Sequence, residues 1–234
     1  MLSAAVKPTF SGDTAFLLMA VGVIGTTITP WGQFYIQAAV VDKGITAKDY
    51  KLTRWDVYIG SFFTGLIAFF IIVATAATLY GNGITIETAQ DAAYALEPLA
   101  GKYASMLFGF GLLGASMLAA FILPLSTAYA VCEALGFEHG INKTYEEAPV
   151  FFGLYTVLIA LGAGMVLWPG LSLYAVMLVS QVINGILLPP ILIFMVLIAS
   201  DKNIMGEYAN SKAYNTLVWM ITLILIALTL LLLF

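Results

Sequence analysis

The segment IGTTITPWGQFYIQ, residues 24–37, places polar residues and a proline in the middle of a long apolar stretch. Pro30 removes a backbone donor and clashes with the carbonyl one turn earlier, so carbonyls near Thr26 and Thr27 lose their helical partners. In hydrocarbon, such carbonyls are tolerated only where they face protein or a water-filled cavity. The segment therefore predicts a helix that is interrupted next to a cavity.

The length of the surrounding stretch supports this interruption. Residues 15–41 would be about 40 Å long as one helix, whereas the hydrocarbon core is roughly 30 Å thick. Two half-helices that meet near Thr29 explain both the excess length and the central polarity, and many secondary transporters hold ions at such discontinuities. The alternative is a simple proline kink in which threonine hydroxyls bond back to carbonyls. Similar breakers, Pro124 and the pair Pro189 and Pro190, lie in two later apolar stretches.

The composition is that of an integral membrane protein. Of the 234 residues, 62% are hydrophobic and 9% are charged, against about 25% charged in ordinary soluble domains. Six apolar stretches are long enough to cross a membrane as helices: about residues 15–41, 57–80, 105–133, 150–168, 171–199 and 214–234. We therefore expect one all-α polytopic membrane domain over residues 1–234. No cleavable leader is evident, so we expect the first span to be the targeting signal.

The chemistry-bearing residues narrow the function classes. The single cysteine, Cys132, excludes an intrachain disulfide, and with the single histidine, His139, it excludes a conventional zinc cluster. Any metal chemistry must then use oxygen ligands. No span presents a nucleophile with a base or paired carboxylates, which argues against an enzyme. We expect no cofactor and no nucleic-acid partner.

Between the second and third spans, ITIETAQDAAYALEP (residues 84–98) has apolar residues at helical spacing. These residues are Ile86, Ala89, Ala93 and Leu96, and the pattern stops before Pro98. The segment predicts a short amphipathic helix that lies on the membrane or packs across the mouth of the bundle.

The basic residues predict an orientation. Seven of the nine fall in the loops after spans one, three and five: Lys43, Lys48, Lys51, Arg54, Lys143, Lys202 and Lys212. Lys7 and Lys102 lie on the other side. By the positive-inside rule, those three loops are cytoplasmic and both termini face outward. An outward amino terminus before an uncleaved span suggests that an upstream segment is missing.

Two segments resemble a known family. GTTITPWGQFYIQAAV (residues 25–40) is similar to the broken sixth helix of the NRAMP metal-ion transporters, where the pattern is Gly-Ala-Thr-Val-Met-Pro-His. LVSQVINGILLPPILIFMVLIASDKNIMGEYANS (residues 178–211) resembles the family's tenth helix and the Ser-Asp-Lys-x-Ile-Met-Gly-Glu segment after it. The resemblance implies a LeuT-type inverted-repeat fold, of which this chain holds helices six to eleven: the second repeat plus one extra helix. The first repeat of five helices, which supplies the family's metal-binding Asp and Asn, has no counterpart here.

The resemblance also implies an ion site. The carbonyl of Thr26 would face the ion, Thr29 would stand where the family's methionine sulfur binds, and Gln181 would approach in the occluded state. Asn184, one turn from Gln181, would share its face. The alternative for this pair is hydrogen bonding between helices. The ion pathway or second ligand shell would then comprise Pro30, Trp31, Gln33, Asn184 and Glu133.

Departures from the family pattern favour magnesium. A threonine hydroxyl is a hard ligand that suits Mg²⁺ or Ca²⁺, whereas methionine sulfur suits transition metals. Trp31 replaces the family's histidine and cannot titrate, so proton coupling through that imidazole is not expected. Thr-Pro-Trp at this place resembles the NRAMP-related magnesium transporter branch. We therefore predict transport of Mg²⁺, with Mn²⁺ second, by alternating access in the cell membrane.

Few carboxylates are available to bind a divalent cation within the membrane. Of the 13 acidic residues only Glu133 falls within a span, near its cytoplasmic end, where it is either an ion-exit group or solvated. His139 with Glu138, Glu146 and Glu147 either collects cations or forms a solvated loop. A cation site without a carboxylate would bind weakly, so we expect a partner half to supply one. The rival prediction is a truncated fragment or membrane assembly subunit that moves no ions.

Overall fold

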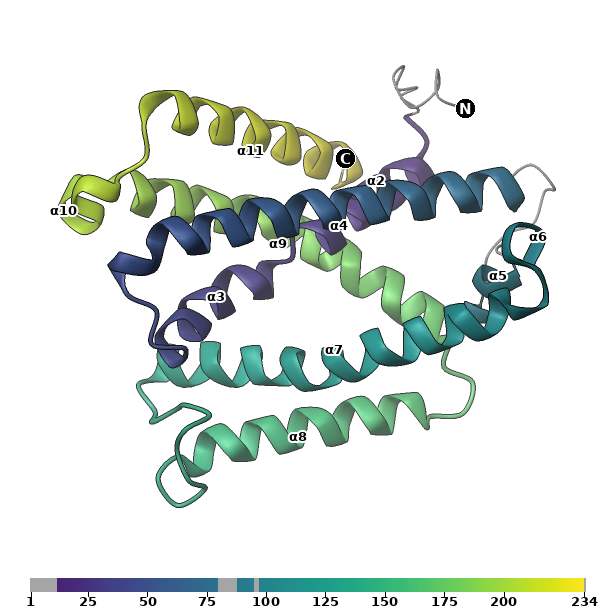
Figure 1. Ribbon diagram of the computed structural model, residues 1–234, viewed down its shortest axis with the longest axis horizontal. Coiled ribbons are helices and arrows are strands. Elements are labelled where there is room, and N and C mark those ends of the chain that lie inside the picture. Colours follow the sequence, from purple (N-terminus) through teal and green to yellow (C-terminus); the bar gives the residue numbers. More distant parts are fainter. Residues whose placement is uncertain (1–11, 80–87, 95–96, 234) are drawn as a thin grey trace. The chain divides into compact units, whose positions relative to one another are not determined.

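In the computed structural model of the protein, residues 12–79, 88–94 and 97–233 are described (Figure 1). Every regular element in these ranges is a helix. Six helical segments of the described residues are long and apolar enough to cross a membrane: Thr14–Asp42, Ala47–Thr78, Ala104–Leu135, Pro149–Val166, Leu173–Ser200 and Lys212–Leu232. The predicted all-α polytopic fold is confirmed.

The first span is two helices. Helix α2 covers Thr14–Thr27 and helix α3 covers Pro30–Asp42. The amide of Ile28 donates to the carbonyl of Ile24 at 2.9 Å, which closes α2. Pro30 is the first residue of α3, the position where its missing N–H leaves no helical bond unmade. The predicted discontinuity is therefore confirmed over the simple kink.

The other three prolines inside spans do not interrupt their helices. Pro124 lies within α7 (Ala104–Leu135), and Pro189 and Pro190 lie within α9 (Leu173–Ser200). One proline removes a single N–H from the helix and leaves the remaining backbone bonds in place. In membrane helices, neighbouring helices and polar side chains satisfy the freed carbonyl.

The described residues 12–34 and 168–233 belong to one of two compact units. In its described part, α9 packs against α2, and α11 (Lys212–Leu233) packs against both (Figure 1). Leu17 and Val21 of α2, Leu188 and Val196 of α9, and Leu225 of α11 are buried. Two short helices, α10 (Lys202–Met205) and η4 (Gly206–Tyr208), connect α9 to α11.

Residues 35–167 form the main part of the other unit. It contains the remainder of α3, then η1 (Ala47–Asp49), α4 (Tyr50–Thr78), α5 (Ala89–Tyr94), α6 (Glu97–Ala100), η3 (Gly101–Tyr103), α7 and α8 (Pro149–Val166). Helices α7 and α8 lie side by side (Figure 1). They share a core cluster with α3: Ala38, Ala128, Tyr129, Cys132, Ala148 and Phe151.

The second membrane-length helix begins earlier than the sequence predicts. Helix α4 begins at Tyr50 rather than near residue 57, because hydropathy marks only the apolar part of a helix. A capping box in which Thr46 and Asp49 bond reciprocally starts the helical region earlier. Large apolar side chains of α4, such as Phe62 and Phe70, are exposed, as expected for a helix that meets lipid or another chain.

The predicted amphipathic helix is observed over the described part of its length. Its observed part is α5, which packs against α7, and Thr88 starts it by donating to the carboxylate of Asp91 at 2.8 Å. Ile86 and Leu96 of the predicted pattern lie outside the described residues. Pro98 is the second residue of a separate short helix, α6, where a missing N–H costs nothing.

Candidate ion-binding site

The break between α2 and α3 consists of Ile28 and Thr29. Thr26, in the last turn of α2, is exposed, and Pro30 cannot donate to its carbonyl. Thr29 is half-buried and occupies the residue before the first of α3, a preferred place for threonine. The break thus joins the negative end of one helix dipole to the positive end of the next, with oxygen groups between them.

One threonine of the segment has a purely local role. The hydroxyl of Thr27 donates to the carbonyl of Val23 at 2.7 Å, within α2. This back-bonding is the feature expected of the kink alternative, and it occurs here at the end of a helix that does stop. Thr26 and Thr29 remain the candidates for ligation.

Helix α9 approaches the main chain of α2 just before the break. A methyl group on Gly25 would lie 2.2 Å from the carbonyl oxygen of Gln181 and 2.4 Å from the amide nitrogen of Gly185. A methyl group on Gly185 would lie 2.4 Å from the carbonyl oxygen of Val21. Only glycine fits at both positions. The structure therefore brings Gln181 next to the turn of α2 that carries Thr26.

Gly25 and Gly185 were not singled out from the sequence. Both glycines could have been recognised as candidates for a helix crossing, because small residues mark close crossings of membrane helices. Gly25 directly precedes Thr26, and Gly185 directly follows Asn184. Gly22, one turn earlier, makes a looser contact: its added methyl would lie 3.5 Å from Val182 Cγ2. The tightest contact is thus at the predicted site.

Gln181 and Asn184 share a face of α9, as their spacing predicts. The amide nitrogen of Asn184 donates to Oε1 of Gln181 at 3.3 Å, and both side chains are half-buried. The bond lies within one helix, so it differs from the interhelical bond considered as the alternative. The bond uses the side-chain nitrogen of Asn184, and the side-chain oxygen of Asn184 takes no part in it. An amide oxygen is the type of ligand that hard cations prefer.

The remaining residues of the predicted pathway fall into two places. Pro30, Trp31 and Gln33 form the first turn of α3, where Pro30 is buried and the other two are half-buried. Glu133 lies in the other compact unit, in the last turn of α7, with its Oε1 3.5 Å from Nε2 of His139. The structure thus gives Glu133 a partner in its own unit.

Two of the three acidic residues in the loop after α7, Glu138 and Glu147, make contacts within the loop. Glu138 pairs with Lys143 at 3.3 Å. Glu147 accepts from the amide of Thr144 at 2.7 Å and from its hydroxyl at 3.1 Å. Both bonds lower the pKa of Glu147 from its usual value, and the bond from the Thr144 amide contributes more than the bond from its hydroxyl. Such contacts favour the solvated-loop alternative over a cation-collecting cluster.

No group of three or more His, Cys, Asp or Glu side chains within the described ranges is arranged to hold a metal ion. The candidate site is made instead of neutral oxygens: main-chain carbonyls at the break, a hydroxyl and side-chain amides. Such ligands suit a hard cation that keeps part of its water shell. They supply no negative charge to offset the cost of desolvating a divalent ion.

Fold and site together define a class: polytopic helical membrane proteins with a discontinuous helix beside a close helix crossing. The sequence model of the Nramp family, described as natural resistance-associated macrophage protein-like, matches residues 1–234, and the chain belongs to this family. The resemblance seen in the two quoted segments is confirmed. The all-α LeuT-type fold class follows from this match together with the six membrane-length helices.

Three curated relatives of the chain are bacterial proteins. The chain is 31% identical over 214 residues to "Divalent metal cation transporter MntH 1" of Pseudomonas aeruginosa, covering 87% of this chain and 47% of the relative. It is 25% identical over 224 residues to the MntH transporter of Clostridium acetobutylicum (93% and 49%). With that of Klebsiella pneumoniae it is 27% identical over 222 residues (93% and 50%). The chain spans about half the length of the curated relatives it matches.

Proposed function

We propose that this chain is part of a transporter of divalent metal cations, with the ion held at the break between α2 and α3. The observation that carries the proposal is the position of the break. It lies beside the crossing at which Gly25 meets the main chain of Gln181, in a member of the Nramp family. Related chains are named as divalent metal cation transporters, which supports the ion class. Transport would need no covalent chemistry and no cofactor.

We further propose Mg²⁺ as the preferred ion, with Mn²⁺ second. Thr29 offers a hard oxygen, and the amides of Gln181 and Asn184 add further oxygen ligands. No sulfur or imidazole ligand is present in the segment from Thr26 to Gln33. A hydrated or partly hydrated magnesium ion suits this set, because Mg²⁺ gives up its waters reluctantly.

In this proposal, the neutral oxygen ligands of this chain form only one part of the ion-binding site. A second set, with a carboxylate, would come from an amino-terminal half that supplies the other inverted repeat. The coverage of about half of each relative supports such a partner. Alternating access would then be a motion of one repeat against the other in the cell membrane, with the termini of this chain outside.

Flux into liposomes tests the proposal. The purified chain is reconstituted alone, and in parallel with a separately expressed amino-terminal half from an Nramp relative, with Mg²⁺- and Mn²⁺-sensitive dyes inside the vesicles. We expect flux only with both halves, and faster flux of Mg²⁺ than of Mn²⁺. Faster Mn²⁺ flux would reject the magnesium preference. No flux under either condition would favour the rival proposal of a non-transporting fragment or assembly subunit.

A further inference from the structure

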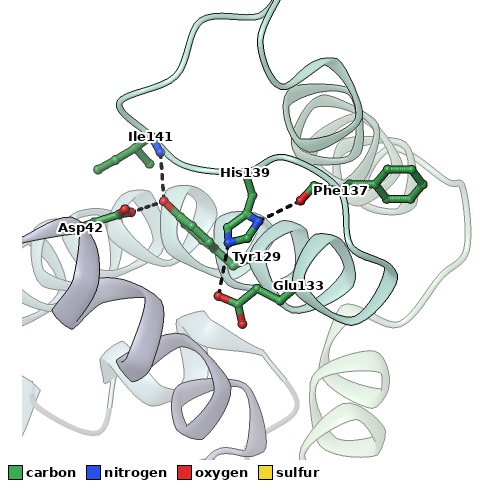
Figure 2. Close-up of polar contacts among 6 residues, drawn as sticks. All are labelled: Asp42, Tyr129, Glu133, Phe137, His139 and Ile141. Carbon is green, nitrogen blue, oxygen red and sulfur yellow. Dashed lines mark hydrogen bonds and ion pairs between the residues drawn. The ribbon is translucent and has the colours of Figure 1, made fainter.

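A buried tyrosine of α7 forms a hydrogen bond with the last residue of α3. The hydroxyl of Tyr129 donates to a carboxylate oxygen of Asp42, the last residue of α3 (Figure 2). The same hydroxyl accepts from the amide of Ile141 at 2.9 Å. The end of α3 therefore meets, at one oxygen, both α7 and the segment that directly follows α7, residues 136–148, which we call the α7–α8 loop.

The ring of Tyr129 fixes the position of this oxygen. The side chain is 2% exposed, and its ring centroid lies 4.8 Å from that of Phe151 in an edge-on arrangement. The rings of Tyr35 and His139 lie 6.1 and 5.7 Å away. Because three aromatic rings pack against the ring of Tyr129, we expect movement of α3 or the loop to break the bonds of its hydroxyl.

A second contact holds the loop to the same helix. His139 Nε2 lies 3.5 Å from Oε1 of Glu133, one turn after Tyr129 on α7 (Figure 2). Its other ring nitrogen, Nδ1, lies 2.9 Å from the carbonyl oxygen of Phe137. The loop therefore contacts α7 at two residues, Tyr129 and Glu133, and the hydroxyl of Tyr129 also contacts α3.

We propose that Tyr129 is a positioning residue that fixes the carboxyl end of the second half-helix. A helix of 13 residues behaves as a stiff rod of about 20 Å, so restraint at Asp42 limits movement at the end where Thr29 and Pro30 lie. The boundary between the two compact units falls inside α3, between Phe34 and Tyr35. The consequence for ion movement rests on the proposed function, whereas the restraint on α3 does not.

Hydrogen exchange of the full chain in lipid nanodiscs tests the restraint. Tyr129→Phe removes the hydroxyl and keeps the ring. We expect amides of residues 35–42, and that of Ile141, to exchange about tenfold faster, because a buried hydrogen bond is lost at both partners. Tyr155→Phe is the matched control: Tyr155 packs on the same core cluster, and its hydroxyl takes no part in these two bonds.

Substitutions at Asp42 keep the proposal falsifiable if Tyr129→Phe fails to fold. Asp42→Asn retains a carbonyl acceptor for the tyrosine hydroxyl and should exchange like the parent. Asp42→Leu removes the acceptor and should resemble Tyr129→Phe. Unchanged exchange in Tyr129→Phe, or equal acceleration in Asp42→Asn and Asp42→Leu, overturns the proposal.

A flux measurement separates this proposal from the proposed function. In the reconstituted two-half system, Tyr129→Phe should change the maximal rate several-fold and KM for the metal less, since it removes no ligand. A several-fold loss of transport that comes from KM alone, with the maximal rate unchanged, would overturn the positioning role. If the parent itself moves no metal, the proposed function fails, and the exchange results still decide whether Tyr129 restrains α3.

Discussion

At the residue scale, Thr29 is the position on which the proposed ion preference depends. A hydroxyl at the break favours hard cations, and a thioether there would favour softer transition metals. The site residues named from the sequence have no charged member apart from Glu133, which pairs with His139 in the other unit. The character of the remaining oxygen ligands therefore decides the preference.

Thr29→Met should shift that preference. We expect the affinity ratio of Mn²⁺ to Mg²⁺ to rise roughly tenfold, or about 1.4 kcal/mol, as sulfur replaces oxygen in the coordination shell. Competition between the two ions in the reconstituted two-half system measures it. Thr27→Met is the matched control, because the Thr27 hydroxyl is already bonded to the carbonyl of Val23. An unchanged ratio in Thr29→Met would place Thr29 outside the coordination shell.

Gly25 and Gly22 give a matched pair for the helix crossing. An alanine methyl at Gly25 would overlap main-chain atoms of Gln181 and Gly185, whereas one at Gly22 would make an ordinary contact with Val182. Overpacking of this kind costs about 1–3 kcal/mol, and backbone atoms cannot move aside as a side chain does. Gly25→Ala should therefore lower the thermal unfolding midpoint by roughly 5 °C, at about 2–4 °C per kcal/mol for a chain of this size.

Gly22→Ala should leave the midpoint within about 2 °C of the parent. Equal midpoints for the two variants, measured in the same detergent, would show that α2 and α9 are not in main-chain contact there. The measurement needs no assumption about transport.

At the element scale, the broken helix depends on more than one proline. Pro30 lies in a segment with glycines on both sides and threonines at the break, and the helix stops. Pro124, Pro189 and Pro190 lie inside helices that continue. A proline removes one donor in each case, so the surrounding residues decide whether the chain unwinds.

Pro30→Ala should test that distinction. The new amide at residue 30 can donate to the carbonyl of Thr26, which would close the helix across the break and compete with a bound ion. We expect slower hydrogen exchange at residues 28–31 and weaker metal binding. Pro124→Ala in the continuous helix α7 is the control, and it should alter neither. Unchanged exchange at the break in Pro30→Ala would mean that other contacts hold it open.

The sequence allowed the spans and the break to be predicted because both depend on local properties. Apolar length marks a span, and Pro30 among threonines marks an interruption. The Gly25–Gly185 crossing and the bond between Tyr129 and Asp42 join residues distant in the chain. Hydropathy does not report which helices touch, so these contacts required the structure. The pairing of Glu133 with His139 likewise depends on how the loop after α7 folds back.

At the scale of the whole molecule, the uneven placement of basic residues predicts an orientation of the chain in the membrane. Seven of the nine basic residues lie in the connections after spans one, three and five or in the first turns of the helices that follow them. Cytoplasmic loops of membrane proteins carry such an excess. The proposed entry of the first span from outside, and with it the idea of an upstream half, depends on this orientation.

Cysteine labelling in cells tests the orientation. In a Cys132→Ala background, which removes the single native thiol, one cysteine is introduced either at Asn142, in the α7–α8 loop, or at Pro169, between α8 and α9. A membrane-impermeant maleimide added to intact cells should label Pro169→Cys, and Asn142→Cys should react only after the cells are opened. The reverse pattern would place both termini inside. A first span entering from the cytoplasm would not match the sixth helix of the proposed arrangement, and only the greater length of the relatives would then support an amino-terminal half.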